Sequence, residues 1–161
     1  MSSEEVVDWL TGIVFGGVAI TTAALEYATG GEELTFTQWR AILFVGDKED
    51  GCRVGEVATL LHAALPATSR LLRRLERRAL ITLDPDEHDR RATRARLTAK
   101  GRSLRSSVLA YRRDEIAAIV AEVKPAASAS RSLRDLSERF NRRGHAGPRP
   151  RRRAADGEDG S

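Results

Sequence analysis

The sequence has very few of the side chains that build metal centres and disulfide frameworks. Cys52 is the single cysteine, and the three histidines, His62, His88 and His145, are far apart along the chain. A lone cysteine excludes an internal disulfide and the multi-cysteine patterns that hold zinc or iron–sulfur clusters. Scattered histidines do not have the spacing of metal ligands. We therefore expect neither a metal site nor a cofactor.

Catalytic signatures are missing as well. In 161 residues there is no nucleophile–base pair, no pair of catalytic carboxylates and no glycine-rich phosphate loop. This length suits one domain with a tail rather than a multidomain enzyme. The start, Met1 to Glu5, is acidic where a secretory signal is basic. The sequence thus predicts a protein that is not an enzyme and that has a cytoplasmic location.

The net charge is only +4, but it is unevenly distributed along the chain. Residues 1–50 hold two basic and nine acidic side chains, whereas residues 65–113 hold fourteen basic and five acidic ones, a net charge of +9. A basic block inside an otherwise acidic to neutral chain indicates a surface for a polyanion such as nucleic acid. Arginine outnumbers lysine by 24 to 3, so compositional bias is the competing explanation, and the positions of the arginines must decide.

An uncharged stretch from Trp9 to Leu25 lies within a helix predicted over residues 4–28. The stretch has 17 residues, whereas a membrane span requires about 20. A helix that is apolar on most sides has to pack against other helices in a soluble protein, and in so short a chain we expect a second subunit to supply them. Two interpretations stay open, a dimerisation helix or a segment that binds lipid or a partner helix.

Turn and capping residues divide the rest of the chain into short elements. Gly30 and Gly31 end the first helix, and Thr35 with Gln38 has the spacing of a capping box for the next helix, which ends near Gly46. The pattern then predicts a short helix over 54–61, a tight connection over 62–65 and a second helix over 66–79. It further predicts strands over 80–84 and 93–98, a long helix over 98–124, and an amphipathic helix carrying Leu133, Leu136 and Phe140.

This order of elements predicts a mainly α fold with a small β-hairpin wing, which is a winged helix-turn-helix. Helices at both chain ends remain outside that unit and form a helical dimerisation region in this interpretation. From residue 144 onward glycine, proline, arginine and acidic residues dominate and no core residue occurs, so we expect a disordered tail.

The helix over residues 66–79 is predicted to have one apolar and one basic face. At about 100° per residue, Thr68, Leu72, Leu75 and Ala79 fall on one side, and Arg73, Arg74 and Arg77 fall within about 60° of Arg70 on the other. An α-helix fits the major groove of DNA, where arginine bonds guanine O6 and N7. Residues near the start of such a helix meet the bases. We predict contacts to bases or phosphates from Ala67, Ser69, Arg70, Arg73, Arg74 and Arg77.

The turn between the two strands carries Asp89, Arg90 and Arg91. An arginine on a wing loop can enter the minor groove where that groove is narrow and strongly negative. In the alternative interpretation Asp89 pairs with a neighbouring arginine in an ordinary polar turn, and both roles are compatible. Arg94 and Arg96 point the same way along their strand, so both are predicted phosphate contacts.

Five segments of the chain form a recognisable set: Leu34-Thr-Phe-Thr-Gln-Trp-Arg40, Val54-Gly-Glu-Val-Ala58, Thr68-Ser-Arg-Leu-Leu-Arg-Arg-Leu-Glu76, Pro85-x-x-x-Asp89-Arg-Arg91 and Leu97-Thr-Ala-Lys-Gly101. Together they resemble the MarR family of transcriptional regulators. The wing motif followed by Leu-Thr-x-x-Gly is the most specific part. The resemblance implies a homodimer held by the first and last helices on a pseudo-palindromic operator. In many members a small-molecule effector binds at the junction of the dimer and DNA-binding regions.

On this basis we expect four parts in the chain: an N-terminal dimerisation helix over 1–30, a winged helix-turn-helix DNA-binding domain over 31–100, C-terminal dimerisation helices over 101–143 and the tail over 144–161. The predicted function is that of a sequence-specific transcriptional regulator, a repressor that binds double-stranded DNA as a homodimer under the control of a small-molecule effector. The alternative is a membrane-associated or protein-interaction module that uses the apolar N-terminal helix.

The sequence departs from the family pattern at several positions. Members often carry an acid where Arg73 stands, and that acid steadies a wing arginine; here either Asp89 takes over this role or the wing is looser. Cys52 has Arg53 beside it, and a cation lowers a thiol pKa, but a half-buried structural thiol is the favoured interpretation. Five aromatic residues form either plain core or the lining of a ligand cavity, namely Trp9, Phe15, Tyr27, Phe36 and Trp39.

Overall fold

A computed structural model describes residues 2–89, 91–123 and 129–145 of the chain. Two compact units are present, Met1–Pro125 and Ala126–Ser161. The first unit contains five helices and three short strands within its described residues, and the second contains the helix α6 (Ala129–His145). The predicted disordered tail falls almost entirely on residues 146–161, which lie outside the described residues. The predicted division into four parts stays a prediction.

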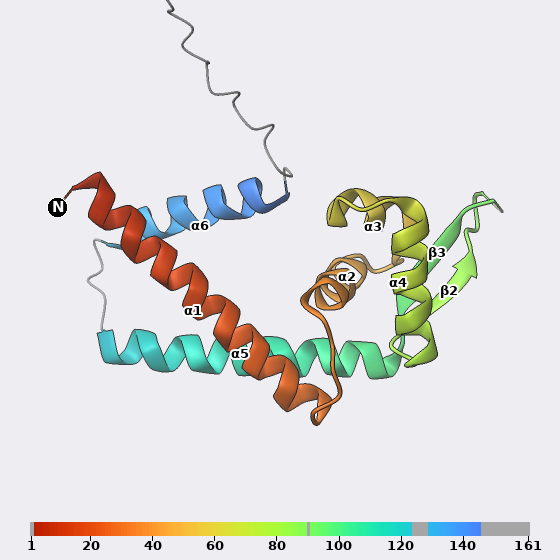
Figure 1. The fold of residues 1–161 in the computed structure, drawn as a ribbon, viewed down its shortest axis with the longest axis horizontal. Coiled ribbons are helices and arrows are strands. Elements are labelled where there is room, and N and C mark those ends of the chain that lie inside the picture. The colour runs from red at the N-terminus through yellow and green to blue at the C-terminus, as the bar shows by residue number, and fades with distance from the viewer. Residues whose placement is uncertain (1, 90, 124–128, 146–161) are drawn as a thin grey trace, which may run out of the picture. The chain divides into compact units, whose positions relative to one another are not determined.

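The first helix, α1 (Ser3–Thr29), has the boundaries that its local signals predict to within a residue. Ser2 and Glu5 form a capping box at its start, and Gly30 ends it in the left-handed conformation with φ of 63°. α1 packs along the long helix α5 (Ala99–Val123), where the Tyr27 and Tyr111 rings have centroids 5.3 Å apart. The crossing of these two helices is visible in Figure 1.

The helix-turn-helix follows α1. Helix α2 (Phe36–Gly46) begins with the predicted capping box. The backbone amide of Gln38 donates to Thr35 Oγ1, and the backbone amide of Thr35 donates to the side-chain oxygen Oε1 of Gln38. Helices α3 (Val54–Leu61) and α4 (Leu65–Arg77) are joined by a three-residue connection. That connection starts at His62, which has a φ of 51° and closes the C-terminus of α3. The predicted order of helices is therefore confirmed.

The small sheet has three strands rather than the two that were predicted. Strands β2 (Ile81–Pro85) and β3 (Thr93–Leu97) form the expected hairpin, and β1 (Cys52–Arg53) pairs with the other side of β3, giving the order β1-β3-β2. All pairs are antiparallel, and Ala95 lies opposite both Cys52 and Leu83. The sheet therefore attaches the wing, which we define as residues 81–97, to the residues directly before α3.

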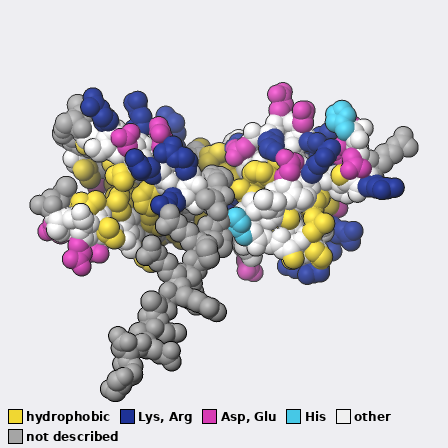
Figure 2. Space-filling view, turned by 90° about the horizontal axis from the view of Figure 1, so that it is seen from above, with side chains coloured by type: hydrophobic (Ala, Val, Ile, Leu, Met, Phe, Trp, Pro, Cys, Tyr) yellow, Lys and Arg dark blue, Asp and Glu magenta, His cyan; other side chains and the backbone are white. Residues whose placement is uncertain are grey.

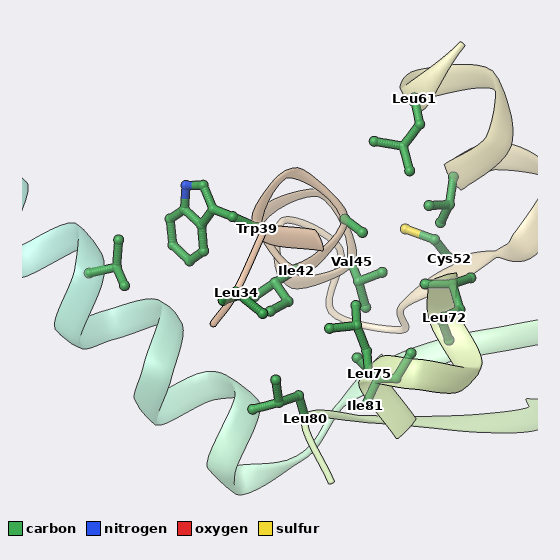
Figure 3. Close-up of a cluster of buried hydrophobic side chains, with 14 of the residues drawn as sticks. Leu34, Trp39, Ile42, Val45, Cys52, Leu61, Leu72, Leu75, Leu80 and Ile81 are labelled. Atoms are coloured by element: carbon green, nitrogen blue, oxygen red, sulfur yellow. The ribbon is translucent and has the colours of Figure 1, made fainter. Parts of the chain in front are cut away.

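The core of the first unit lies where α2, α3, α4 and the sheet meet. Its fully buried members include Trp39 and Ile42 from α2, Leu72 and Leu75 from α4, and Ile81 from β2. Figure 3 shows Leu72, Leu75 and Ile81 on the same side of α2 as Cys52, whereas the Trp39 ring extends from the opposite side of that helix. Because both helices of the helix-turn-helix and the wing share this core, the position of α4 relative to the wing is fixed by packing.

The end of α4 differs slightly from the prediction. The helix ends at Arg77. Ala79, which the helical spacing of about 100° per residue placed on the apolar face, is exposed and has a left-handed φ of 55°. Thr98 binds the residues that follow α4: its amide donates to the Leu80 carbonyl at 3.1 Å, and its hydroxyl donates to the Ala79 carbonyl at 2.7 Å. The wing thus starts and ends at the same point of the structure.

The outer surface of α1 is largely apolar. Among its buried residues the structure records only Thr21, Ala24 and Leu25, whereas Ile13 and Phe15 are 66% and 72% exposed. Exposed apolar side chains also occur in the second half of α5, namely Ile116, Ile119, Val120 and Val123. By length and composition alone, α1 is the one helix among the described residues that is able to cross a membrane.

Candidate DNA-binding surface

Helix α4 presents basic side chains on one face and packs with the other. Thr68, Leu72 and Leu75 are buried, and the side chains predicted to meet DNA lie opposite them. The four exposed arginines, which we call the arginine face, are Arg70, Arg73, Arg74 and Arg77. In Figure 2, Lys and Arg side chains are visible among acidic ones over the part of the first unit that carries α4 and the wing.

The arginine face has no acidic partner among the described residues, because none of its four side chains takes part in a hydrogen bond or ion pair there. Glu76, the acid on α4, instead accepts a hydrogen bond from the Leu83 amide at 3.1 Å. Arg78 differs from the arginine face, since it donates to the Glu33 carbonyl and pairs with Glu32 at 2.9 Å. The guanidinium groups of the arginine face are therefore available to an anion.

The start of α4 carries the two small residues predicted to approach bases. Ala67 is exposed, and Ser69 is half-buried with its hydroxyl donating to the Leu65 carbonyl at 2.9 Å. Small side chains at this end of the helix allow the backbone to come close to a partner surface. Ser69 also lines a groove of about 300 Å³ that runs between α4, the start of α3 and the wing residues Arg91 to Thr93.

A buried carboxylate organises the wing. Asp86 is 1% exposed and accepts hydrogen bonds from Arg53 and Arg94, which also form ion pairs with it at 2.9 and 2.7 Å. Its Oδ1 further accepts from the amides of His88 and Asp89, each at 3.1 Å. Hydrogen bonds from Arg53 outweigh burial and hold the pKa of Asp86 well below its usual range. We call Asp86, Arg53 and Arg94 the Asp86 cluster.

The structure gives Arg94 a partner that the sequence did not indicate. Its side chain is 17% exposed, and its guanidinium also donates to the Gly51 carbonyl at 3.2 Å. Arg96 pairs with Glu87 at 2.8 Å, so it too is engaged within the wing. Both arginines were predicted phosphate contacts, but these geometries commit them to protein partners before any DNA is present.

The wing tip holds the remaining predicted residues. Arg91 is exposed, and its amide donates to Asp89 Oδ1 at 3.0 Å. Arg90 lies outside the described residues. Of the two alternatives left open for the wing, a pairing by Asp89 or a looser loop, neither describes the geometry fully, because Asp86 is the residue that binds the guanidinium groups.

The sequence contains a local signal for part of the Asp86 geometry. An aspartate at the first position of a turn commonly accepts the amides two and three residues on, which is the geometry of Asp86 with His88 and Asp89. The pairing with Arg53, 33 positions earlier, has no such local signature. Only the antiparallel alignment of β1 with β3 brings Arg53 beside Arg94.

Cys52 has the surroundings of a structural thiol. It is fully buried in the core, and burial raises its pKa to about 11 in spite of the nearby Lys48. Arg53, the neighbour that was considered as an activating cation, turns its guanidinium to Asp86 instead. The interpretation of a packed thiol therefore fits the structure better than that of a reactive one.

The five aromatic residues do not gather around one cavity in the described part of the chain. Trp39 is core, while Trp9, Phe15, Tyr27 and Phe36 are exposed. A hollow of about 280 Å³ does exist between the end of α1, the end of α4 and the start of α5. None of the five aromatics lines it; its lining includes Thr29, Glu32, Arg78, Lys100, Ser103 and Ser107.

Residues 33–92 match the family model described as MarR family. Residues 33–92 belong to the MarR family. This segment contains α2, β1, α3, α4 and β2, and the Asp86 cluster except for Arg94, whereas β3 lies beyond it. Among proteins with curated functions, none matches this sequence.

Solved structures extend the likeness to the helices outside the MarR-family segment. RV1404 from Mycobacterium tuberculosis is 28% identical with a TM-score of 0.75, over 92% of this chain and 97% of that one. The transcriptional regulator Tm0710 from Thermotoga maritima is 24% identical with a TM-score of 0.63, over 91% and 100%. S. aureus MepR is 19% identical with a TM-score of 0.57, over 84% and 96%, in a variant bound to an oligodeoxyribonucleotide.

The MarR-family match and the arginine face of α4 together support a DNA-binding transcriptional regulator. The winged-helix fold is shown by the similar structures, which span almost the full length of their own chains. The helices at both ends of this chain are thus part of the shared fold and not an addition to it.

Proposed function

We propose that the chain is a homodimeric regulator that binds a pseudo-palindromic site in double-stranded DNA and represses the promoter it covers. The observation that carries the proposal is the arginine face of α4, with four guanidinium groups exposed above a fully buried opposite side. S. aureus MepR, which has a similar fold, is solved bound to an oligodeoxyribonucleotide, and this supports a DNA-binding role for the present chain.

Each predicted residue has a role in the proposal. Ala67, Ser69 and Arg70 meet base edges in the major groove, and Arg73, Arg74 and Arg77 bind bases or phosphates along the groove. Arg91 enters the minor groove beside the site, and Arg90 is proposed to assist it. Arg94 supports the wing through Asp86 rather than binding phosphate first, because its guanidinium is already paired.

A second copy of the chain supplies the other half of the DNA contact. The exposed apolar surfaces of α1 and α5 are available to pack against a second copy. Burial of apolar surface stabilises a complex by about 25 cal/mol per Å². Two α4 helices in such a dimer would read half-sites about 34–36 Å apart, one turn of the duplex. A regulator of this kind works in the cytoplasm, where its DNA is.

An effector is part of the proposal through the hollow between α1, α4 and α5. Its lining combines the hydroxyls of Ser103 and Ser107 with the cations Arg78 and Lys100. S. aureus MepR, the similar fold, is also solved bound to ethidium bromide, which supports regulation by a small molecule. These donors in the lining favour a ligand with acceptor oxygens over a purely apolar one.

Selection of duplexes from random DNA with the full-length chain tests the proposed function. We expect enrichment of a pseudo-palindrome, and a slope of log K against log salt near −7 if about eight phosphates are neutralised. Arg70→Ala should weaken binding to the selected duplex by about 1–3 kcal/mol and blur the preference at one base position. An equal loss on selected and random duplexes would show that Arg70 contacts no base. Failure to bind any duplex at low salt would reject the function.

The exposed surface of α1 also favours the alternative, a membrane-associated module. Cell fractionation separates the two functions. A dimeric regulator should leave the membrane fraction after a high-salt wash, whereas a helix seated in lipid should stay there because salt does not weaken hydrophobic insertion. Retention after that wash would favour the alternative.

A further inference from the structure

Asp86 is an unusual residue in a surface that is proposed to bind DNA. In the described part of the chain no other carboxylate or basic side chain is as fully buried. Burial of a charge is unfavourable unless it is paired and hydrogen-bonded, and both oxygens of Asp86 are occupied. This degree of satisfaction in a surface loop indicates a fixed geometry rather than an ordinary polar turn.

The partners of Asp86 come from three separate parts of the structure. Arg53 is the residue directly before α3, Arg94 belongs to β3, and the amides of His88 and Asp89 belong to the wing turn. The contacts continue to the tip, because Asp89 Oδ1 accepts from the Arg91 amide at 3.0 Å. A continuous chain of hydrogen bonds therefore runs from the start of α3, through Asp86, to Arg91.

We propose that Asp86 is a positioning residue for DNA recognition, which sets the place of Arg91 relative to helix α4 by tying the wing turn to Arg53. This inference rests on the proposed function. Arg53 and Arg91 line the same groove as Ser69, so in this proposal the Asp86 cluster sets the distance between the wing tip and the start of α4. The cluster keeps one positive charge in excess, since one carboxylate neutralises two guanidinium groups incompletely.

Electrostatics and positioning predict opposite effects for the loss of this carboxylate. Removal of a negative charge from a DNA-binding surface should strengthen binding, because the phosphates then meet a more positive surface. Asp86→Asn removes that charge but turns an amide donor toward guanidinium donors, so it breaks the cluster. Glu87→Gln is the matched control, with the same charge change one residue away on an exposed side chain.

The test measures binding of both variants to the duplex selected with the wild-type chain. We expect Asp86→Asn to weaken binding about tenfold, the size of one lost groove contact, and Glu87→Gln to leave binding unchanged or stronger. Footprinting should show that minor-groove protection is lost in Asp86→Asn while protection of guanine N7 in the major groove remains. Identical binding and footprints for the two variants would overturn the proposal.

A double-mutant cycle with Arg91→Ala tests whether Asp86 acts through the wing tip. If it does, Arg91→Ala weakens binding in the wild-type background but has little further effect in the Asp86→Asn background, because coupled residues are not additive. A purely structural role for Asp86 would leave the effect of Arg91→Ala the same in both backgrounds. Additivity therefore counts against the proposal.

Amide exchange of the wild-type chain provides a measurement that does not depend on the folding of a variant. The His88 and Asp89 amides sit in a surface turn yet should exchange slowly, because both donate to Asp86. Exchange at the rate of an open loop would overturn the proposal even if the chain binds DNA well. Conversely, protected amides in a chain that binds no duplex would reject the proposed function and leave the hydrogen-bond geometry standing.

Discussion

The thiol of Cys52 illustrates how the surroundings of one side chain determine its chemistry. Its Sγ lies 3.6 Å from the Phe44 carbonyl inside the core, and burial raises its pKa to about 11. At pH 8 the native thiol is therefore almost wholly protonated, and thiols react through the thiolate. We expect alkylation by iodoacetamide at pH 8 to be far slower in the native protein than in urea. Equal rates in the two states would contradict a buried thiol.

The pKa of the Asp86 carboxyl is lowered, whereas that of the Cys52 thiol is raised, and this shift leads to a prediction about pH. Its native pKa lies well below the ordinary value, held there by Arg53, so its contribution to stability is present above the unfolded pKa of about 3.9 and is lost as the pH falls through the native pKa. We expect the NMR signal of the Asp86 carboxyl carbon to stay unchanged between pH 7 and 4. A midpoint near 4 for Asp86 would contradict the paired geometry.

At the scale of helices and strands, local signals predicted most boundaries. The capping residues Ser2 and Thr35, the glycine at position 30 and the apolar spacing along α3 act within a few residues, so the sequence contains them directly. The third strand could not be predicted in the same way, because Cys52 pairs with Ala95, 43 positions away. The same long-range pairing brings Arg53 to Asp86, so the wing cluster was missed for the same reason.

The junction between the wing and α5 depends on Gly101. A Cβ at this position would overlap the Leu80 carbonyl oxygen, which already accepts the Thr98 amide. We expect Gly101→Ala to destabilise the fold by about 1–3 kcal/mol, as overpacking does, in urea unfolding followed by circular dichroism. Gly55→Ala on α3 is the control: nothing lies within 4 Å of its added methyl group, and it should be neutral or stabilising. Similar losses for the two variants would argue against the close approach.

At the scale of the whole molecule, the exposed apolar surface of α1 decides between a dimer and a lone chain. Phe15 is 72% exposed within one copy, and a buried charge in a subunit interface is strongly unfavourable. We therefore expect Phe15→Glu to convert the dimer to monomers in sedimentation velocity and to weaken DNA binding at the same time. Leu65→Glu, at a 53% exposed position on α4, should leave the dimer intact. A dimer that persists in Phe15→Glu would place the interface elsewhere.

Thr98 joins the two ends of the wing, because its hydroxyl donates to the Ala79 carbonyl and its amide donates to the Leu80 carbonyl. A change in the length of the hairpin beyond these hydrogen bonds would leave the end of α4 and the start of α5 in place. Insertions or deletions confined to the hairpin would then change how far its tip reaches, without redrawing the helical frame. Related chains that differ in hairpin length would therefore differ in the length of DNA that the proposed wing contact covers, while their helices keep the same arrangement.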